Sequence, residues 1–292
     1  MRPAGAVHFL GIDFQNPILL AAGTAGFGRE LAGVIDLDRL GGLVTKSVSL
    51  EPRSGHPSPR VAEFPGGMLN AIGLANPGID AVVRDELPWL STRLRRARVL
   101  VSVVGSTVRD YVTVVERLAS EPSVTALELN LSCPNTDRGG EHFGADETVL
   151  ADLLRRCRAV ARHPLIAKLA PTLSDIGRTA KTAADAGADA ITVVNTIPGT
   201  LFRGVTGVAN PTRRLGATGG GVSGPALLPV GVLATQRVRE ASGLPVIGVG
   251  GVRMPDDVRQ YLAAGATLVA IGTAALADPR RPERLARAWA DG

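Results

Sequence analysis

The stretch TALELNLSCPN, residues 125–135, is an apolar run that passes directly into a polar loop. Its first eight residues have the hydrophobic content of a buried parallel strand. The loop contains Cys133, one of only two cysteines in the chain. Loops at the carboxyl ends of parallel strands often carry functional residues. The stretch therefore predicts a buried strand that is followed directly by a functional loop.

Seven other apolar runs repeat this form and alternate with helical patterns along the chain. The eight predicted strands cover residues 17–23, 42–48, 98–105, 125–132, 164–170, 190–196, 245–251 and 268–274. The helical patterns between them include residues 147–162, 174–188, 225–242 and 255–266. Eight βα units in about 250 residues are typical of a TIM barrel. We therefore expect an α/β fold, a (β/α)8 barrel.

Three further segments complete the predicted architecture. The opening VHFLGIDFQNP, residues 7–17, predicts a short N-terminal hairpin that closes the barrel floor, with its central glycine in the turn. Residues 49–80 and 197–225 are rich in proline and glycine and too long for simple connections. Both follow strands, so we expect long loops at the C-terminal face. We find no domain boundary and expect residues 1–292 to form a single domain.

Composition excludes several classes of protein. Hydrophobic residues make up 45% of the chain, but no uninterrupted apolar run is long enough for a membrane span. The N-terminus lacks the apolar region of a signal peptide. Two cysteines without a Cys-x-x-Cys pattern predict neither a disulfide framework nor a metal site. We therefore expect a cytoplasmic protein without a metal centre.

The net charge of +5 comes from basic residues scattered over the predicted helices. A nucleic-acid-binding protein would show a basic stripe with interleaved aromatic residues, and this chain has none. Solvated helix faces explain most of the charge, and a field that attracts small anionic substrates is the alternative.

Lysine is rare here, occurring only at positions 46, 168 and 181, whereas arginine is abundant. This bias indicates positions where a compact ammonium has to fit and a guanidinium does not. Lys181 lies in a helical pattern and needs no functional explanation. Lys46 and Lys168 lie near the ends of predicted strands and are candidate functional residues.

Asparagines form a second candidate group. The chain has seven, and Asn70, Asn130, Asn135 and Asn195 would lie on one rim of the barrel. A neutral amide offers both a donor and an acceptor, which suits a planar heterocycle with alternating N–H and C=O groups. The alternative is that asparagine is simply common in loops.

The last two predicted strands end in small residues just before a helix. Backbone N–H groups in the loops after strands seven and eight of a barrel commonly bind phosphate. Gly250, Gly251, Gly272 and Thr273 are the predicted donors. Glycine also allows close helix–strand packing, so one such turn alone is weak evidence for phosphate binding. Its occurrence on two adjacent strands makes the evidence stronger. It predicts a phosphorylated ligand or cofactor.

Cys133 is a candidate nucleophile or general base, because it precedes Pro134 in a polar loop at the predicted barrel mouth. Cys157, in contrast, lies in a helical pattern and fits a buried structural residue. The four histidines show no triad-like spacing with Cys133, although His142 is close in sequence. This disfavours hydrolysis of the Cys-His type and favours a base that works beside a flavin.

Several motifs together resemble class 1 dihydroorotate dehydrogenases, and most closely the 1B branch. They are TKSVSLEPR, GMLNAIGLANPG, NLSCPN with the following GGEHFGAD, VNTIPG and TGGGVSGPAL, and the resemblance runs from NPILLAAGTAGFG to AIGTAAL. The resemblance implies a flavin mononucleotide (FMN) barrel that oxidises (S)-dihydroorotate to orotate in pyrimidine biosynthesis. Class 2 enzymes carry serine in place of Cys133 and an N-terminal extension, and this chain has neither.

The resemblance also implies residue roles. Cys133 would be the base for the C5 proton, while hydride passes from C6 to flavin N5. The implied FMN contacts are Ala22, Lys46, Ser47, Ser102, Asn130, Lys168, Val194, Gly224, Gly250, Gly251, Gly272 and Thr273. The implied substrate contacts are Lys46, Asn70, Ala71, Ile72, Gly73, Leu74, Asn130, Asn135, Asn195 and Thr196. Ala22 and Ser102 depart from the serine and asparagine usual in the family, and both changes touch flavin contacts.

The 1B branch implies a partner as well. The loop TDRGGEHFGAD is similar to that branch, in which an iron–sulfur, FAD-containing subunit passes electrons to NAD. This chain lacks cysteines for a cluster, so the partner would be a separate subunit, with a homodimer core inside a heterotetramer. The alternatives are a class 1A-like enzyme that uses fumarate, a dehydrogenase of another reduced pyrimidine, and a non-catalytic barrel that binds a phosphorylated ligand. Dihydropyrimidine dehydrogenases typically read CPH where this chain reads CPN.

Overall fold

The computed structural model describes residues 5–132, 143–203 and 212–291 and contains a closed parallel barrel of eight strands. The barrel strands in chain order are β3 (Ile18–Leu20), β4 (Gly42–Val44), β7 (Arg98–Val103), β8 (Ala126–Asn130), β9 (Leu165–Leu169), β10 (Ala190–Val193), β13 (Val246–Val249) and β14 (Leu268–Ile271). All eight predicted strands are confirmed, and each ends earlier than its apolar run. The chain therefore has the predicted TIM-barrel fold.

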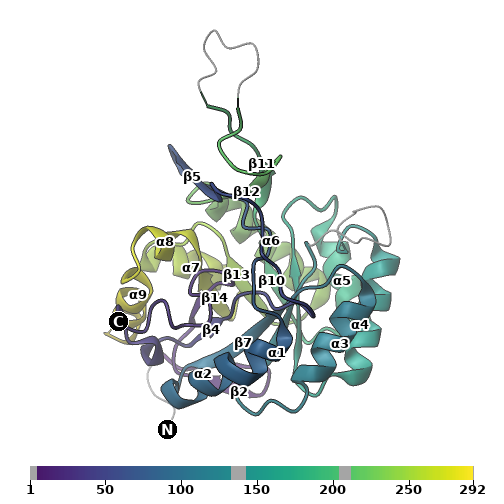
Figure 1. Ribbon diagram of the computed structural model, residues 1–292. Helices are drawn as coiled ribbons and strands as arrows, with labels where there is room; N and C mark the ends of the chain where they lie inside the picture. The colour runs from purple at the N-terminus through teal and green to yellow at the C-terminus, as the bar shows by residue number, and fades with distance from the viewer. Residues whose placement is uncertain (1–4, 133–142, 204–211, 292) are drawn as a thin grey trace.

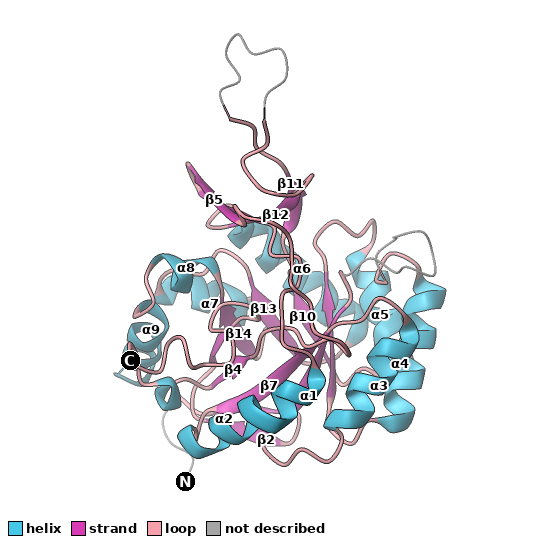
Figure 2. Ribbon diagram, in the orientation of Figure 1, coloured by secondary structure: helices cyan, strands magenta, loops and turns pink. Residues whose placement is uncertain are grey.

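Helices surround these strands, as Figures 1 and 2 show. They are α1 (Ile79–Ala81), a π-helical turn η2 (Val82–Glu86), α2 (Leu87–Arg93), α3 (Val108–Leu118), α4 (Glu147–Val160), α5 (Ile176–Asp185), α6 (Leu227–Ser242), α7 (Pro255–Ala263), α8 (Thr273–Ala277) and α9 (Arg281–Asp291). The connection from β3 to β4 differs from the regular pattern, because it holds only the 3-10 turn η1 (Leu37–Arg39).

The N-terminal hairpin closes the floor of the barrel, as predicted. Strands β1 (Val7–Phe9) and β2 (Ile12–Phe14) pair antiparallel across Gly11, which has a φ of 76°. Phe9 and Phe14 are 2% and 1% exposed and meet edge to face, with ring centroids 5.9 Å apart. They pack against the inward-facing residues at the amino ends of the strands. Water is thereby excluded from that end.

The two long segments are not simple loops, because they pair with each other in a four-stranded antiparallel sheet. The sheet has the order β11 (Ile197–Gly199), β12 (Gly220–Ser223), β6 (Gly67–Asn70) and β5 (Val61–Phe64). It lies above the barrel in Figure 1. Leu69, Ala71 and Leu215 are buried in its small core. Residues distant in sequence therefore meet over the carboxyl ends of the barrel strands.

The chain's two tyrosines fix the backbone at the carboxyl ends of two barrel strands. Tyr111 of α3 donates its hydroxyl to the carbonyl of Asn130 at 2.6 Å, and Tyr261 of α7 donates to the carbonyl of Gly250 at 2.7 Å. Both rings are fully buried. Gly231 and Gly248 leave the space that the Tyr261 ring occupies, since a Cβ at either position would overlap it. The glycine of the VIGVGG pattern at position 248 is thus explained by packing.

Replacing Gly248 by alanine is expected to lower the free energy of unfolding by about 1–3 kcal/mol, because overpacking a buried ring displaces side chain or backbone. Urea unfolding of the full chain measures the change. Gly33→Ala is the matched control, since Gly33 is exposed and nothing lies within 4 Å of an added Cβ. If the two variants have the same free energy of unfolding, the Tyr261 ring does not pack against Gly248 as described.

Candidate active site

The predicted polar residues collect at the carboxyl ends of the barrel strands. Asn130 is the last residue of β8, Lys168 lies in β9, and Asn195 and Thr196 follow β10. Lys46 follows β4, and its backbone N–H donates to the carbonyl of Gly26 at 2.8 Å. Because the strands are parallel and the barrel is closed, these residues share one face of the molecule.

The side chains of Asn130 and Asn195 and the backbone of Thr196 form a continuous polar rim. Asn195 Nδ2 donates to Asn130 Oδ1 at 3.1 Å, and the backbone N–H of Thr196 donates to Asn195 Oδ1 at 2.8 Å. Both amides are half-buried. These bonds fix the orientation of the two amides. The direction in which Asn130 Nδ2 can donate a hydrogen bond is thereby set as well. The prediction that Asn130 and Asn195 lie together is confirmed.

The four-stranded sheet carries Asn70 to the same region. Asn70 Nδ2 donates to the carbonyl of Gly221 at 3.0 Å, and Asn70 and Gly221 are also paired in register between β6 and β12. Gly221 lies against the side chain of Thr196, where an added Cβ would overlap the threonine. Asn70 and Thr196 therefore flank the same glycine, although 126 positions separate them in the sequence.

Residues 71–74 follow Asn70 in a tightly held turn. Leu74 has a φ of 57°, a conformation that non-glycine residues rarely adopt. Asn76 supports it: its Nδ2 donates to the Leu74 carbonyl and to Ser49 Oγ, both at 2.8 Å. Its Oδ1 accepts the N–H of Gly78 at 2.9 Å. Sequence reasoning missed Asn76, which is buried and shapes the turn.

A layer of polar side chains crosses the interior of the barrel. Ser102, Glu128, Lys168 and Thr192 each lie two residues beyond an interior apolar residue of β7, β8, β9 or β10, so all four face inward. Lys168 Nζ donates to Glu128 Oε1 at 3.2 Å, and the two side chains are 9% and 1% exposed. Sequence reasoning missed Glu128 and Thr192. Both could have been found as polar residues at the alternate positions of a buried strand that face the barrel interior.

This layer contains a polar atom that the described residues leave without a partner. Thr192 is 1% exposed, and its Oγ1 has no hydrogen-bond partner within the ranges that the structure describes. Thr192 is directly opposite Lys168 in the pairing of β10 with β9. A buried hydroxyl beside a buried ammonium fits a polar ligand seated on this layer, because such groups otherwise stay unsatisfied.

Ser47 and Ser102 are paired with each other at a separation of 2.9 Å between their hydroxyl oxygens. Both are buried, and the backbone N–H of Ser102 also donates to Thr45 Oγ1 at 3.3 Å. The hydroxyl of Ser102 lies at the same level as Glu128, its register partner in β8. Ala22 is half-buried and packs on the interior apolar cluster.

The small residues after β12, β13 and β14 lie together. Thr273 Oγ1 donates to Ser223 Oγ at 2.8 Å, and Ser223 precedes Gly224. Gly250 lies against Leu227 and Val194, and Gly251 lies against Leu228. Gly224, Gly250 and Gly251 have φ values of 128°, 127° and 75°, which favour glycine. A Cβ at Gly272 would meet nothing closer than 3.8 Å, so the space before it is open.

Charged side chains of both signs act on Lys46 at the barrel mouth. Burial lowers the pKa of the Lys46 ammonium; the Glu30 carboxylate opposes this shift, and the Arg60 guanidinium adds to it. Arg60 is held by the backbone carbonyls of His56 and Ser54, at 2.6 and 2.8 Å. The segment before β5 therefore brings a fixed positive charge to the site, which suits an anionic ligand. Sequence reasoning did not select Arg60.

Cys133, Asn135 and His142 lie outside the described residues. The other cysteine, Cys157, is buried in α4, and burial raises the pKa of its thiol to about 12. A thiol in that state is inert at neutral pH. This agrees with the structural role predicted for Cys157.

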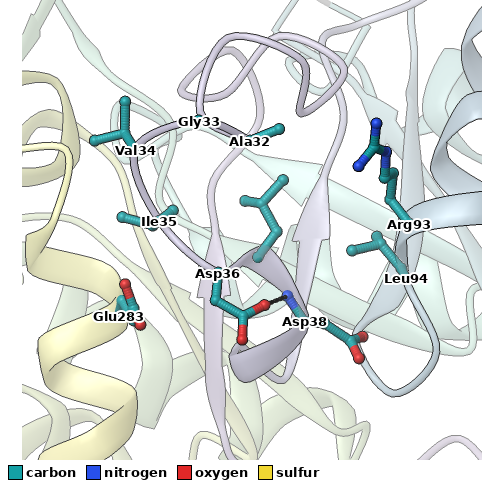
Figure 3. A pocket seen from close by; sticks show the side chains of 10 residues that line it. Ala32, Gly33, Val34, Ile35, Asp36, Asp38, Arg93, Leu94 and Glu283 are labelled. Atoms are coloured by element: carbon teal, nitrogen blue, oxygen red, sulfur yellow. Dashed lines mark hydrogen bonds between the residues drawn. The ribbon is translucent and has the colours of Figure 1, made fainter.

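A surface pocket of about 470 Å³ lies near the amino ends of β4 and β7, away from these residues (Figure 3). Asp38 lines it and accepts the backbone N–H groups of Arg95, Arg96 and Ala97 at 2.7–2.9 Å. Burial alone would raise the pKa of Asp38, but these three bonds and the Arg96 charge hold it below its usual value. The carboxylate thus has a structural role, and none of the predicted site residues lines this pocket.

The described ranges contain neither a metal-binding cluster nor a membrane-spanning helix. No cluster of three or more His, Cys, Asp or Glu side chains could hold a metal ion there. No helix in those ranges is both long enough and apolar enough to cross a membrane.

Comparison of the sequence with known proteins assigns the chain to a family. The sequence model described as dihydroorotate dehydrogenase matches residues 5–289. A relative from Geobacillus kaustophilus, named dihydroorotate dehydrogenase B (NAD(+)), catalytic subunit, is 45% identical over 94% of this chain and 86% of its own length. Proteins of the same name from Cutibacterium acnes and Desulforudis audaxviator are 44% and 45% identical, over 94% and 96% of this chain and 88% and 89% of their own lengths. The chain therefore belongs to the dihydroorotate dehydrogenase family.

Proposed function

We propose that this protein, a single domain over residues 1–292, is an FMN-dependent oxidoreductase that converts (S)-dihydroorotate to orotate in pyrimidine biosynthesis. One observation carries the proposal: in a member of this family, the Asn130–Asn195 amide pair and the buried Lys168 ammonium share one barrel mouth. Amides suit the alternating donors and acceptors of a pyrimidine ring, and the ammonium suits a ring that becomes negatively charged.

FMN fits the residues at the carboxyl ends of β12, β13 and β14. Gly224, Gly250, Gly251, Gly272 and Thr273 would hold the phosphate end, where the turns at Gly224 and Gly251 leave no room for a side chain and the space before Gly272 is open. Val194 lies beside Gly250 and would line the flavin. The bound FMN would supply a hydride acceptor at N5. Lys168, Thr192 and the Ser47–Ser102 pair would face the ring system from inside the barrel, with Ala22 contributing backbone.

The substrate would lie between the amide rim and the sheet. Asn130, Asn135, Asn195 and Thr196 would bind the pyrimidine edge. Asn70 and the turn of residues 71–74 would bind the carboxylate, with Lys46 between the flavin and the substrate. The fixed Arg60 charge adds an attraction for an anionic substrate. Asn76, which supports Leu74, would preserve the shape of this turn.

Two hydrogens leave the substrate in different forms. The Cys133 thiolate would take the C5 proton, and the C6 hydrogen would leave as hydride toward flavin N5. The product gains the C5–C6 double bond, so atoms and charge balance. The amide rim would orient the ring so that C5 faces the thiolate, which is where positioning contributes to the rate.

Electrons would leave through a separate iron–sulfur, FAD-containing subunit to NAD, in an assembly built on a homodimer core. The names of the relatives, which specify NAD(+) and a catalytic subunit, support this. We expect such an assembly in the cytoplasm.

Anaerobic mixing of the purified protein with dihydroorotate is expected to bleach the flavin absorbance rapidly, because hydride transfer removes the oxidised chromophore. A stopped-flow absorbance record measures the rate. A protein that binds FMN but bleaches only with another reduced pyrimidine would contradict the substrate proposed here. A protein that binds no flavin would contradict the enzyme class.

Replacing Cys133 by serine is expected to slow flavin reduction at neutral pH by roughly 10²–10⁴-fold, because a serine hydroxyl is a far weaker base than a thiolate. Orotate binding, measured from its perturbation of the flavin spectrum, should persist. The matched control is Cys157→Ala, which removes the other cysteine from the helix core. Rapid reduction in the Cys133 variant would assign the proton to another base.

A further inference from the structure

The Glu128–Lys168 pair is the starting point, because nothing in the proposed reaction so far uses Glu128. Its carboxylate is 1% exposed and accepts a bond from Lys168 Nζ at 3.2 Å. Burying two charges carries a large desolvation penalty, and replacing such a pair by apolar residues often stabilises a protein. Elsewhere the barrel interior holds residues such as Leu100, Ile166 and Ile247. The pair therefore calls for a functional explanation.

The neighbours of Lys168 give it no second countercharge within the described residues. Asn130 and Thr192 are its register partners in β8 and β10, and both are neutral. Ser102 of β7 is the register partner of Glu128 and is also neutral. Lys46, which follows β4 at the same face of the barrel, is a further cation. Glu128 is thus the anion that faces the ammonium.

We propose that Glu128 is a positioning residue that keeps the Lys168 ammonium protonated and in place in both redox states of the flavin. The inference rests on the proposed function, since it assigns Lys168 to the flavin ring. Glu128 supplies the countercharge that a buried ammonium beside a neutral oxidised ring would otherwise lack. With Glu128, the positive charge is present before the ring becomes negative.

The charge balance shows what this arrangement achieves. A hydride carries two electrons and one proton, so a neutral oxidised ring becomes a reduced ring with one negative charge. The permanent Lys168 charge offsets that negative charge without any proton entering the buried layer. A lysine that was neutral in the oxidised state would instead have to take up a proton for each hydride received. Glu128 thereby uncouples hydride transfer from proton delivery to the barrel interior.

The test is the pH dependence of the flavin midpoint potential of the full chain with FMN bound. For a two-electron couple, each proton taken up shifts the potential by about 30 mV per pH unit. We expect a slope of about 30 mV per pH unit between pH 7 and 9 with Glu128 present, because only the hydride's proton is taken up. The measurement is made in the Cys133→Ser background, so that the thiol does not titrate.

Glu128→Gln keeps the size of the side chain and removes its charge. The slope is then expected to rise to about 60 mV per pH unit, because Lys168 takes up a second proton on reduction. Glu128→Asp, which keeps the charge, should retain the lower slope. Thr235→Val is the control: it removes a buried hydroxyl of α6, outside this layer, without changing charge, and should also retain the lower slope.

An unchanged slope in Glu128→Gln would overturn the proposal. So would a slope near 60 mV per pH unit with Glu128 present, a measurement that remains decisive if the glutamine variant does not fold. A purely structural role for Glu128 would alter stability and FMN affinity but not this slope. Failure of the proposed function is distinguishable, because it would appear as absent flavin or, in the protein with Cys133 intact, as absent reduction by dihydroorotate.

Discussion

Closure of the parallel barrel is the constraint on which the other features depend. Once β9 and β13 both pair with β10, no strand edge is left open, and every strand presents its carboxyl end to the same face. Residues that a linear sequence separates by a hundred positions or more become neighbours there. The hairpin with Phe9 and Phe14 seals the opposite end, so ligands have access to the barrel interior from the carboxyl face.

The interior of this barrel changes character from floor to mouth. Apolar side chains fill the lower level, and the next level on β7 to β10 is polar and partly charged. Such a layer costs desolvation free energy, so its groups must be paired. Glu128 and Lys168 satisfy this requirement with each other, while Thr192 Oγ1 remains available toward a ligand. Side chains inside the barrel therefore contribute to the site as well as those on its loops.

Above the mouth, the four-stranded sheet contributes the second half of the site. Its strands come from two segments on either side of four barrel strands in the sequence, and they are joined by the pairing of β6 with β12. That pairing brings Asn70 against Gly221 and Thr196. An anionic substrate would bind between a rigid amide rim below and a sheet whose neighbouring segment carries Arg60.

Local patterns in the sequence were sufficient for the barrel, because buried parallel strands are continuous apolar runs and need no knowledge of their partners. They also placed Lys46, Asn130, Lys168 and Asn195 correctly, since a residue at a strand end inherits its position from the strand. The sheet of β5, β6, β11 and β12 was not foreseen, because its short, glycine-rich strands carry little propensity and are specified by pairing across the chain. The partnership of Glu128 with Lys168 was likewise decided by tertiary structure. The two are not register partners, since Ile166 lies opposite Glu128 and Asn130 lies opposite Lys168, so their contact in the barrel interior depends on how the strands are staggered in the closed barrel.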